Sequence, residues 1–98
     1  MIIAELSIVP LGTTGTSVSR YVTLVLTTLR ANTHITIYPN AMATVIEAPD
    51  LPTLFTAVEQ AHNAVLSTGA PRVITTLKID DRRDKNATVA SKLKHITG

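Results

Sequence analysis

The chain has 98 residues, enough for one domain, and 45% of them are hydrophobic while only 16% are charged. This composition excludes intrinsic disorder, and a net charge of +2 is too small by itself to argue for binding to nucleic acid. A domain of this size buries only about two-thirds of its unfolded surface. The apolar composition therefore predicts that part of the surface is covered by another copy of the chain.

The absence of cysteine excludes a disulfide framework, a thiolate nucleophile and a cysteine-based metal site. The first residues carry no basic leader, and no stretch approaches the roughly 18 uncharged apolar residues of a membrane span. We therefore expect a cytoplasmic protein that does not bind membranes.

The first half of the chain predicts a strand, a helix and a hairpin. Residues 2–9 alternate as a strand, and residues 10–15 have the composition of a loop. Ser17 is placed to cap a helix over roughly 18–30. Residues 34–48 then indicate a hairpin that turns at Pro39-Asn40. The apolar stripe of the helix comprises Val18, Tyr21, Val22, Val25, Leu26 and Leu29.

The second half predicts another helix, a fourth strand and a short tail helix. Asp50 can cap the second helix, which Gly69 ends. Residues 72–79 alternate as a strand, and residues 80–86 form a charged loop or strand end. Thr88 can cap a tail helix with Val89, Leu93 and Ile96 on one side. The inward stripe of the second helix comprises Leu51, Leu54, Phe55, Val58, Ala61, His62, Val65 and Leu66.

The order β-α-β-β-α-β predicts an α+β fold, the ferredoxin-like sandwich, as a single domain over residues 1–98. Right-handed crossovers place both helices on one face of a four-stranded antiparallel sheet and leave the other face open. That face is too apolar to leave in water and too polar for a core, which favours pairing of two sheets around a small polar pocket. It should carry Ile3, Glu5, Ser7, Val9, Ile74, Thr76, Lys78 and one set from the hairpin.

Two carboxylates stand in otherwise apolar strands, where an unpaired charge is costly to bury. Glu5 is best explained as exposed or paired at a subunit interface. For Glu47, contact with a cationic or amine-bearing ligand and structural pairing, for example with Lys78, are equally supported. The glycine-rich segment 11–17 leads from a strand into a helix, and a ligand-binding loop and a simple connector are again equally supported.

The remaining polar residues favour structural roles. His62 lies on an apolar helix stripe, where a locally hydrogen-bonded histidine is more common than a ligand, and no histidine or carboxylate spacing suggests a metal site. Residues 80–85 mix both charges, which indicates a self-compensating loop or intersubunit ion pairs rather than a phosphate site. Few aromatic residues are available to stack bases, so we expect no nucleic-acid partner.

Four segments of the sequence form a recognisable set. They are residues 2–13 (IIAELSIVPLGT), 16–22 (TSVSRYV), 44–47 (TVIE) and 72–85 (RVITTLKIDDRRDK), the last being the most specific. Together they resemble the small thiamine-binding-protein family (UPF0045, DUF77; MTH1187/YkoF-like). The resemblance spans nearly the whole chain. The sequence departs from the family pattern at Arg20, Ala43, Ala48 and Val89-Ala90.

The resemblance implies a ferredoxin-like fold, homodimers paired through their sheets, often tetramers, no established catalysis and no cofactor. It also implies binding of thiamine or its hydroxymethylpyrimidine moiety. In such a site Glu47 would accept from the pyrimidine amine and balance the thiazolium charge. The other candidate ligand contacts are the hydroxyls of Ser7, Ser17 and Thr76, the ring of Tyr38 for stacking, and Lys78.

Three functions are compatible with these observations. The first is an intracellular oligomeric protein that binds thiamine or a related aminopyrimidine. The second is a structural or regulatory homo-oligomer without a ligand. The third is an enzyme that uses Glu47 and His62, and it ranks last because no nucleophile, base and orienting group share a readable spacing.

Overall fold

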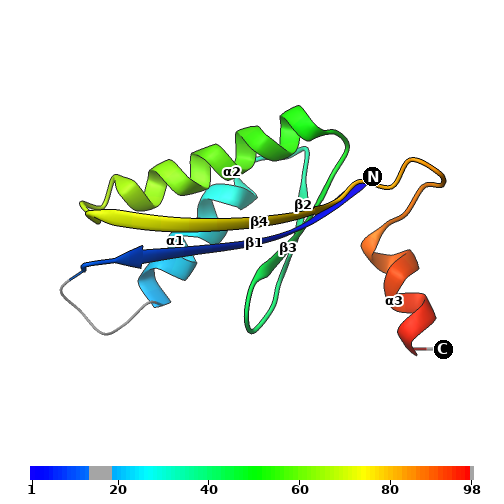
Figure 1. Ribbon diagram of the computed structural model, residues 1–98, viewed down its shortest axis with the longest axis horizontal. Helices are drawn as coiled ribbons and strands as arrows, with labels where there is room; N and C mark the ends of the chain where they lie inside the picture. Colours follow the sequence, from blue (N-terminus) through cyan, green and yellow to red (C-terminus); the bar gives the residue numbers. More distant parts are fainter. Residues whose placement is uncertain (14–18, 98) are drawn as a thin grey trace.

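The computed structural model describes residues 1–13 and 19–97 and confirms the ferredoxin-like α+β fold (Figure 1). The cap predicted at Ser17 and the predicted helix start at residue 18 lie outside the described residues. The strands are β1 (Ile2–Leu11), β2 (Thr36–Pro39), β3 (Thr44–Ala48) and β4 (Arg72–Asp80), and the helices are α1 (Ser19–Arg30), α2 (Leu51–Leu66) and α3 (Val89–Thr97).

The four strands form one antiparallel sheet in the order β2-β3-β1-β4. β3 pairs with β1 only as far as Leu6, whereas β4 pairs with β1 as far as Leu11. Residues 7–11 of β1 therefore have a β-partner on one side only. The loop expected from Pro10 onward begins later, because this half-paired strand end accepts a proline, which lacks the N–H that a second ladder would use.

The hydrophobic core lies between the sheet and the two long helices, which pack against each other. Alternation along β1 points one set of side chains into the core, and the i, i+4, i+8 spacing of α1 supplies its buried stripe. The buried residues of these two elements are Ile2, Ala4, Leu6, Tyr21, Val25 and Leu29. The open face predicted for the other side of the sheet is confirmed, because Glu5, Thr76 and Lys78 share that side and are exposed.

The ends of α2 agree with the sequence, but its inward stripe is narrower than predicted. An Asp50 carboxylate oxygen accepts the N–H of Thr53 at 2.8 Å, and Gly69 takes a φ of +94° after the helix. Phe55 and Leu66, expected to face inward, are 49% and 40% exposed. At 100° per residue they lie on the flank of the stripe, and the small Ala57 is buried on its other side.

The tail helix begins with a reciprocal cap. The Thr88 hydroxyl accepts the Ser91 N–H at 3.0 Å, and the Ser91 hydroxyl accepts the Thr88 N–H at 2.9 Å. This pair satisfies two backbone donors at the start of the helix, so the cap predicted at Thr88 is confirmed. Figure 1 shows α3 beyond the end of the sheet that also holds the N-terminus, apart from the two long helices.

Candidate functional site

The open face of the sheet brings most of the predicted site residues together. Tyr38, Val45, Glu5 and Lys78 are consecutive partners across all four strands and form one row. On one side of this row lies the row of Thr36, Glu47, Ile3 and Asp80, and on the other the pair Ser7 and Thr76. Five of the six candidates thus share one face, while Ser17 lies outside the described residues.

These residues are neighbours on a surface rather than walls of an enclosed cavity. Strands lie about 4.8 Å apart, so Tyr38 on β2 and Lys78 on β4 are separated by roughly 14 Å. Glu47 lies diagonally next to Tyr38 and Glu5, at the roughly 7–8 Å that separates diagonal neighbours on adjacent strands. A small molecule on this flat face could reach some of these groups from one side only.

The Glu47 carboxylate is already used on one of its two oxygens. Its Oε2 accepts the N–H of Val89, the first residue of α3, at 2.8 Å. The first N–H groups of a helix have no partner within the helix, and the helix dipole makes this end favourable for a negative charge. Glu47 therefore has a structural partner, as one of the two predicted roles requires, but this partner is a backbone amide instead of Lys78.

Glu5 and Lys78 face each other in the register without forming a close ion pair. Within the described part of the chain, the side-chain ion pairs join Arg82 to Asp84, Arg83 to Asp81 and Lys92 to Asp80. Glu5 and Lys78 are exposed on the open face. Both charges are therefore available to a ligand or to a second sheet.

The charged segment after β4 compensates itself. Arg82 and Arg83 each hold a carboxylate with two parallel hydrogen bonds of 2.6–2.8 Å, from Arg82 to Asp84 and from Arg83 to Asp81. Hydrogen bonds from these guanidinium groups hold the pKa of Asp81 and of Asp84 below its usual value. The charges of this segment therefore compensate each other within the chain, as the sequence predicts.

His62 lies on the helix side of the sheet. Its Nδ1 is 2.6 Å from the Thr75 hydroxyl of β4, which confirms the expected local hydrogen bond. Thr75 alternates with Thr76, so the histidine and Glu47 are on opposite faces of the sheet. The structure does not bring together the two residues on which the enzymatic hypothesis depends.

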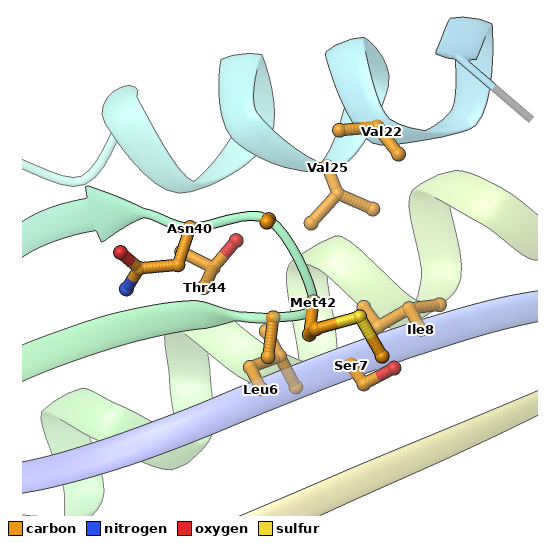
Figure 2. A pocket seen from close by; sticks show the side chains of 10 residues that line it. Leu6, Ser7, Ile8, Val22, Val25, Asn40, Met42 and Thr44 are labelled. Carbon is orange, nitrogen blue, oxygen red and sulfur yellow. The ribbon is translucent and has the colours of Figure 1, made fainter.

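A pocket of about 140 Å³ opens where β3 stops pairing with β1. Figure 2 shows Val22 and Val25 of α1 on one side of it, and Met42 from the β2–β3 turn beside Ser7 and Ile8 of β1. Ser7 is the one sequence-predicted candidate in its lining. The polar residues Asn40 and Thr44 also line it, and sequence reasoning did not select them. The one signal for this pocket in the sequence was that the first strand was predicted to be longer than the strands of the hairpin.

Two further properties bear on the kind of site. No cluster of three or more histidine, cysteine or acidic residues that could hold a metal occurs in residues 1–13 and 19–97. None of the helices in those residues is long and apolar enough to cross a membrane.

The fold is that of a family of small α+β proteins, and the comparison with known proteins identifies this family. The family described as "Thiamine-binding protein" matches residues 4–97, so the chain belongs to this family. A UPF0045 protein of Methanothermobacter thermautotrophicus is 45% identical over 98% of this chain and 96% of the relative. The UPF0045 protein YqgV of Bacillus subtilis is 38% identical over 98% of this chain and 94% of its own.

Solved structures agree with this assignment. The hypothetical protein MJ1052 from Methanocaldococcus jannaschii is 42% identical and superposes with a TM-score of 0.88 over 98% of this chain and 95% of that chain. A domain of unknown function from Bacillus cereus is 27% identical, with a TM-score of 0.82 over 94% and 86% of the two chains. The resemblance predicted from the four sequence segments is therefore confirmed.

Proposed function

We propose that this protein is a non-catalytic homo-oligomeric binding protein for thiamine or its hydroxymethylpyrimidine moiety, and that the ligand binds between the open sheet faces of two copies. The observation that carries the proposal is that Ser7, Tyr38, Glu47, Thr76 and Lys78 share this one face in a chain of the thiamine-binding-protein family. Two such dimers could pair into a tetramer.

The chemistry of the face suits an aminopyrimidine. Glu47 keeps Oε1 to accept from the ligand's amine while Oε2 stays with Val89. Lys78 can donate to a ring nitrogen, and the hydroxyls of Ser7 and Thr76 can donate or accept without adding charge. Tyr38 offers an aromatic surface for stacking. For thiamine itself, the carboxylate of Glu47 or of the nearby Glu5 can balance the positive thiazolium.

A second copy is required because one sheet cannot surround the ligand. The candidate groups spread over roughly 14 Å of a flat surface, whereas binding sites bury most of the surface of a small ligand. A facing sheet supplies the missing wall and covers the exposed apolar residues Val9, Ile74 and Tyr38, which are 44%, 43% and 36% exposed.

Isothermal titration calorimetry with thiamine and with hydroxymethylpyrimidine tests the proposal, with the oligomer mass measured on the same sample. We expect saturable binding at a fixed ratio per subunit and a dimer or tetramer mass. Glu47→Gln keeps an oxygen for the Val89 N–H but removes the charge, so it should weaken binding. Glu59→Gln, an exposed carboxylate on α2, is the matched control and should bind as wild type does. Equal binding by wild type and Glu47→Gln would contradict the role assigned to Glu47.

A ligand-free structural or regulatory homo-oligomer is the second candidate. The hydrogen bond from the Val89 N–H to Glu47 favours this second function, because it gives the Glu47 carboxylate a structural role that needs no ligand. In this case the two sheets pack against each other without a cavity between them. A well-folded oligomer that produces no heat with either ligand would support this function over the first.

A further inference from the structure

The tail helix α3 is anchored to one row of the open face. The Val89 N–H donates to Glu47 Oε2 at 2.8 Å, and the Lys92 ammonium pairs with the Asp80 carboxylate. Glu47 on β3 and Asp80 on β4 are both register partners of Ile3 on β1. The first turn of α3 therefore bridges β3 and β4 at one end of the sheet, the end that also holds the N-terminus (Figure 1).

The packing of α3 is concentrated at its base. Ala87, just before the helix, is 6% exposed, whereas Leu93 and Ile96 further along it are 51% and 78% exposed. A helix of nine residues is shorter than the ~12–15 residues that are marginally stable alone in water. The docking of α3 therefore depends on its contacts with the sheet, and a change at Glu47 shifts the balance between docked and undocked helix.

Glu47 provides the negative charge that the start of this helix favours. The first turn of α3 has no acidic residue of its own. The N–H groups of that turn have no partner within the helix and form the positive end of its dipole. The Thr88 hydroxyl accepts the Ser91 N–H, and Glu47 accepts the Val89 N–H. The sheet thus completes the helix start, and the helix start in turn fixes one oxygen of the carboxylate.

A fixed Glu47 carboxylate should bind a ligand more tightly than a freely rotating one. Immobilising one flexible side chain on binding weakens affinity by about two- to tenfold. The bond from Val89 holds Oε2 before any ligand arrives, which removes this cost from the binding step. An ionised carboxylate offers about four acceptor sites, so a donor on Oε2 leaves room for a second donor on Oε1.

We infer that Val89 is a positioning residue of the binding site, and that docking of α3 and binding of an amine-bearing ligand to Glu47 stabilise each other. The inference rests on the ligand contact proposed above for Glu47. The Val89 N–H orients the carboxylate for the ligand, and a ligand held by Oε1 keeps Oε2 in reach of Val89. Since such coupling is reciprocal, the factor by which docked α3 strengthens ligand binding is the factor by which the ligand strengthens docking.

Val89→Pro tests the positioning role, because this change removes the N–H and suits the helix start. Proline is favoured at the first position of a helix, which Val89 occupies, and the residue before a proline prefers the extended backbone of an N-cap. Val89→Ala keeps the N–H and is the matched control. Isothermal titration with hydroxymethylpyrimidine, and with thiamine, should show binding about two- to tenfold weaker for Val89→Pro and unchanged for Val89→Ala.

Amide hydrogen exchange followed by NMR tests the reciprocal effect, which a merely structural contact would not produce. In wild type, a saturating concentration of the ligand that binds should slow exchange at the amides of Leu93 and Lys94. The factor should be similar to the loss of affinity in Val89→Pro. In Val89→Pro, the same ligand at saturation should leave exchange in α3 unchanged.

The outcomes separate this inference from the proposed function. If wild type binds either ligand and Val89→Pro binds it equally or more tightly, the inference is overturned and the proposed function stands. Binding to wild type without slower exchange in α3 has the same meaning, and this measurement decides alone if Val89→Pro loses its tail helix. A wild-type protein that binds neither ligand would overturn both.

Discussion

Replacement of Glu47 by alanine tests the contact that holds the start of α3 to the sheet. The N···O distance from Val89 to the carboxylate is 2.8 Å. A hydrogen bond to a charged group contributes about 1.5–3 kcal/mol, and Glu47 is only half-buried. The lower end of the range is therefore appropriate, and a loss of about 1.4 kcal/mol corresponds to about a tenfold change in an equilibrium constant.

Amide hydrogen exchange followed by NMR measures this effect at the site. In Glu47→Ala, the Val89 amide should exchange about tenfold faster than in wild type, while amides of the β1–β4 ladder should keep their rates. Glu47→Gln should produce a smaller increase, because the amide oxygen still accepts from Val89. Glu5→Ala removes an exposed carboxylate from the neighbouring row and is the matched control.

An unchanged rate at Val89 in Glu47→Ala would refute the reasoning, since it would mean that the carboxylate does not hold the helix. A uniform increase at all amides, in the ladder as well as in α3, would refute it differently. Such a result would show that Glu47 supports the whole fold instead of the base of α3.

Three further predictions concern the fold itself. Leu54 is fully buried, so Leu54→Ala should lower the free energy of unfolding, measured by denaturant titration, by about 2–5 kcal/mol. Phe55 is half-exposed, so Phe55→Ala should lower it clearly less. Asp50→Ala removes the cap of α2 and should lower the midpoint of unfolding in the same assay, because the Thr53 N–H loses its partner. Arg83→Ala should raise the pKa of Asp81 toward its ordinary 3.8 in an NMR titration, because the pair with Arg83 holds it lower. A carboxyl group whose pKa is lowered by folding stabilises the protein at a pH above its ordinary pKa. This stabilisation is lost as the pH falls through the lowered pKa, so any stability difference between this variant and wild type should vanish in strong acid.

Local patterns in the sequence determine most of the fold. The alternation of residues 2–9 and 72–79 assigns the faces of both strands, and the register confirms the side of the sheet on which Ser7, Thr76 and Lys78 lie. Capping chemistry correctly locates the starts of α2 and α3, because Asp50 and Thr88 bond to amides only three residues away. Interactions of this range can be predicted from the residues alone.

The site is less predictable because it depends on contacts between distant residues. The partner of Glu47 is an amide 42 positions later, and no spacing rule indicates it. The pocket beside Ser7 arises because β1 continues past the point where β3 stops, a consequence of strand lengths that composition does not define. The exposure of Phe55 illustrates the same limit, since only the packing of α2 distinguishes the centre of an apolar stripe from its flank.

Chemical-shift mapping by NMR with hydroxymethylpyrimidine tests the central claim most directly. The account predicts saturable shifts at the open face, above all at Ser7, Glu47 and Thr76, together with Val89, whose amide shares the Glu47 carboxylate. Residues on the helix side, such as His62, should move little. Shifts confined to the helix side, or no shifts in a folded oligomer, would contradict the claim that two sheet faces form the binding site.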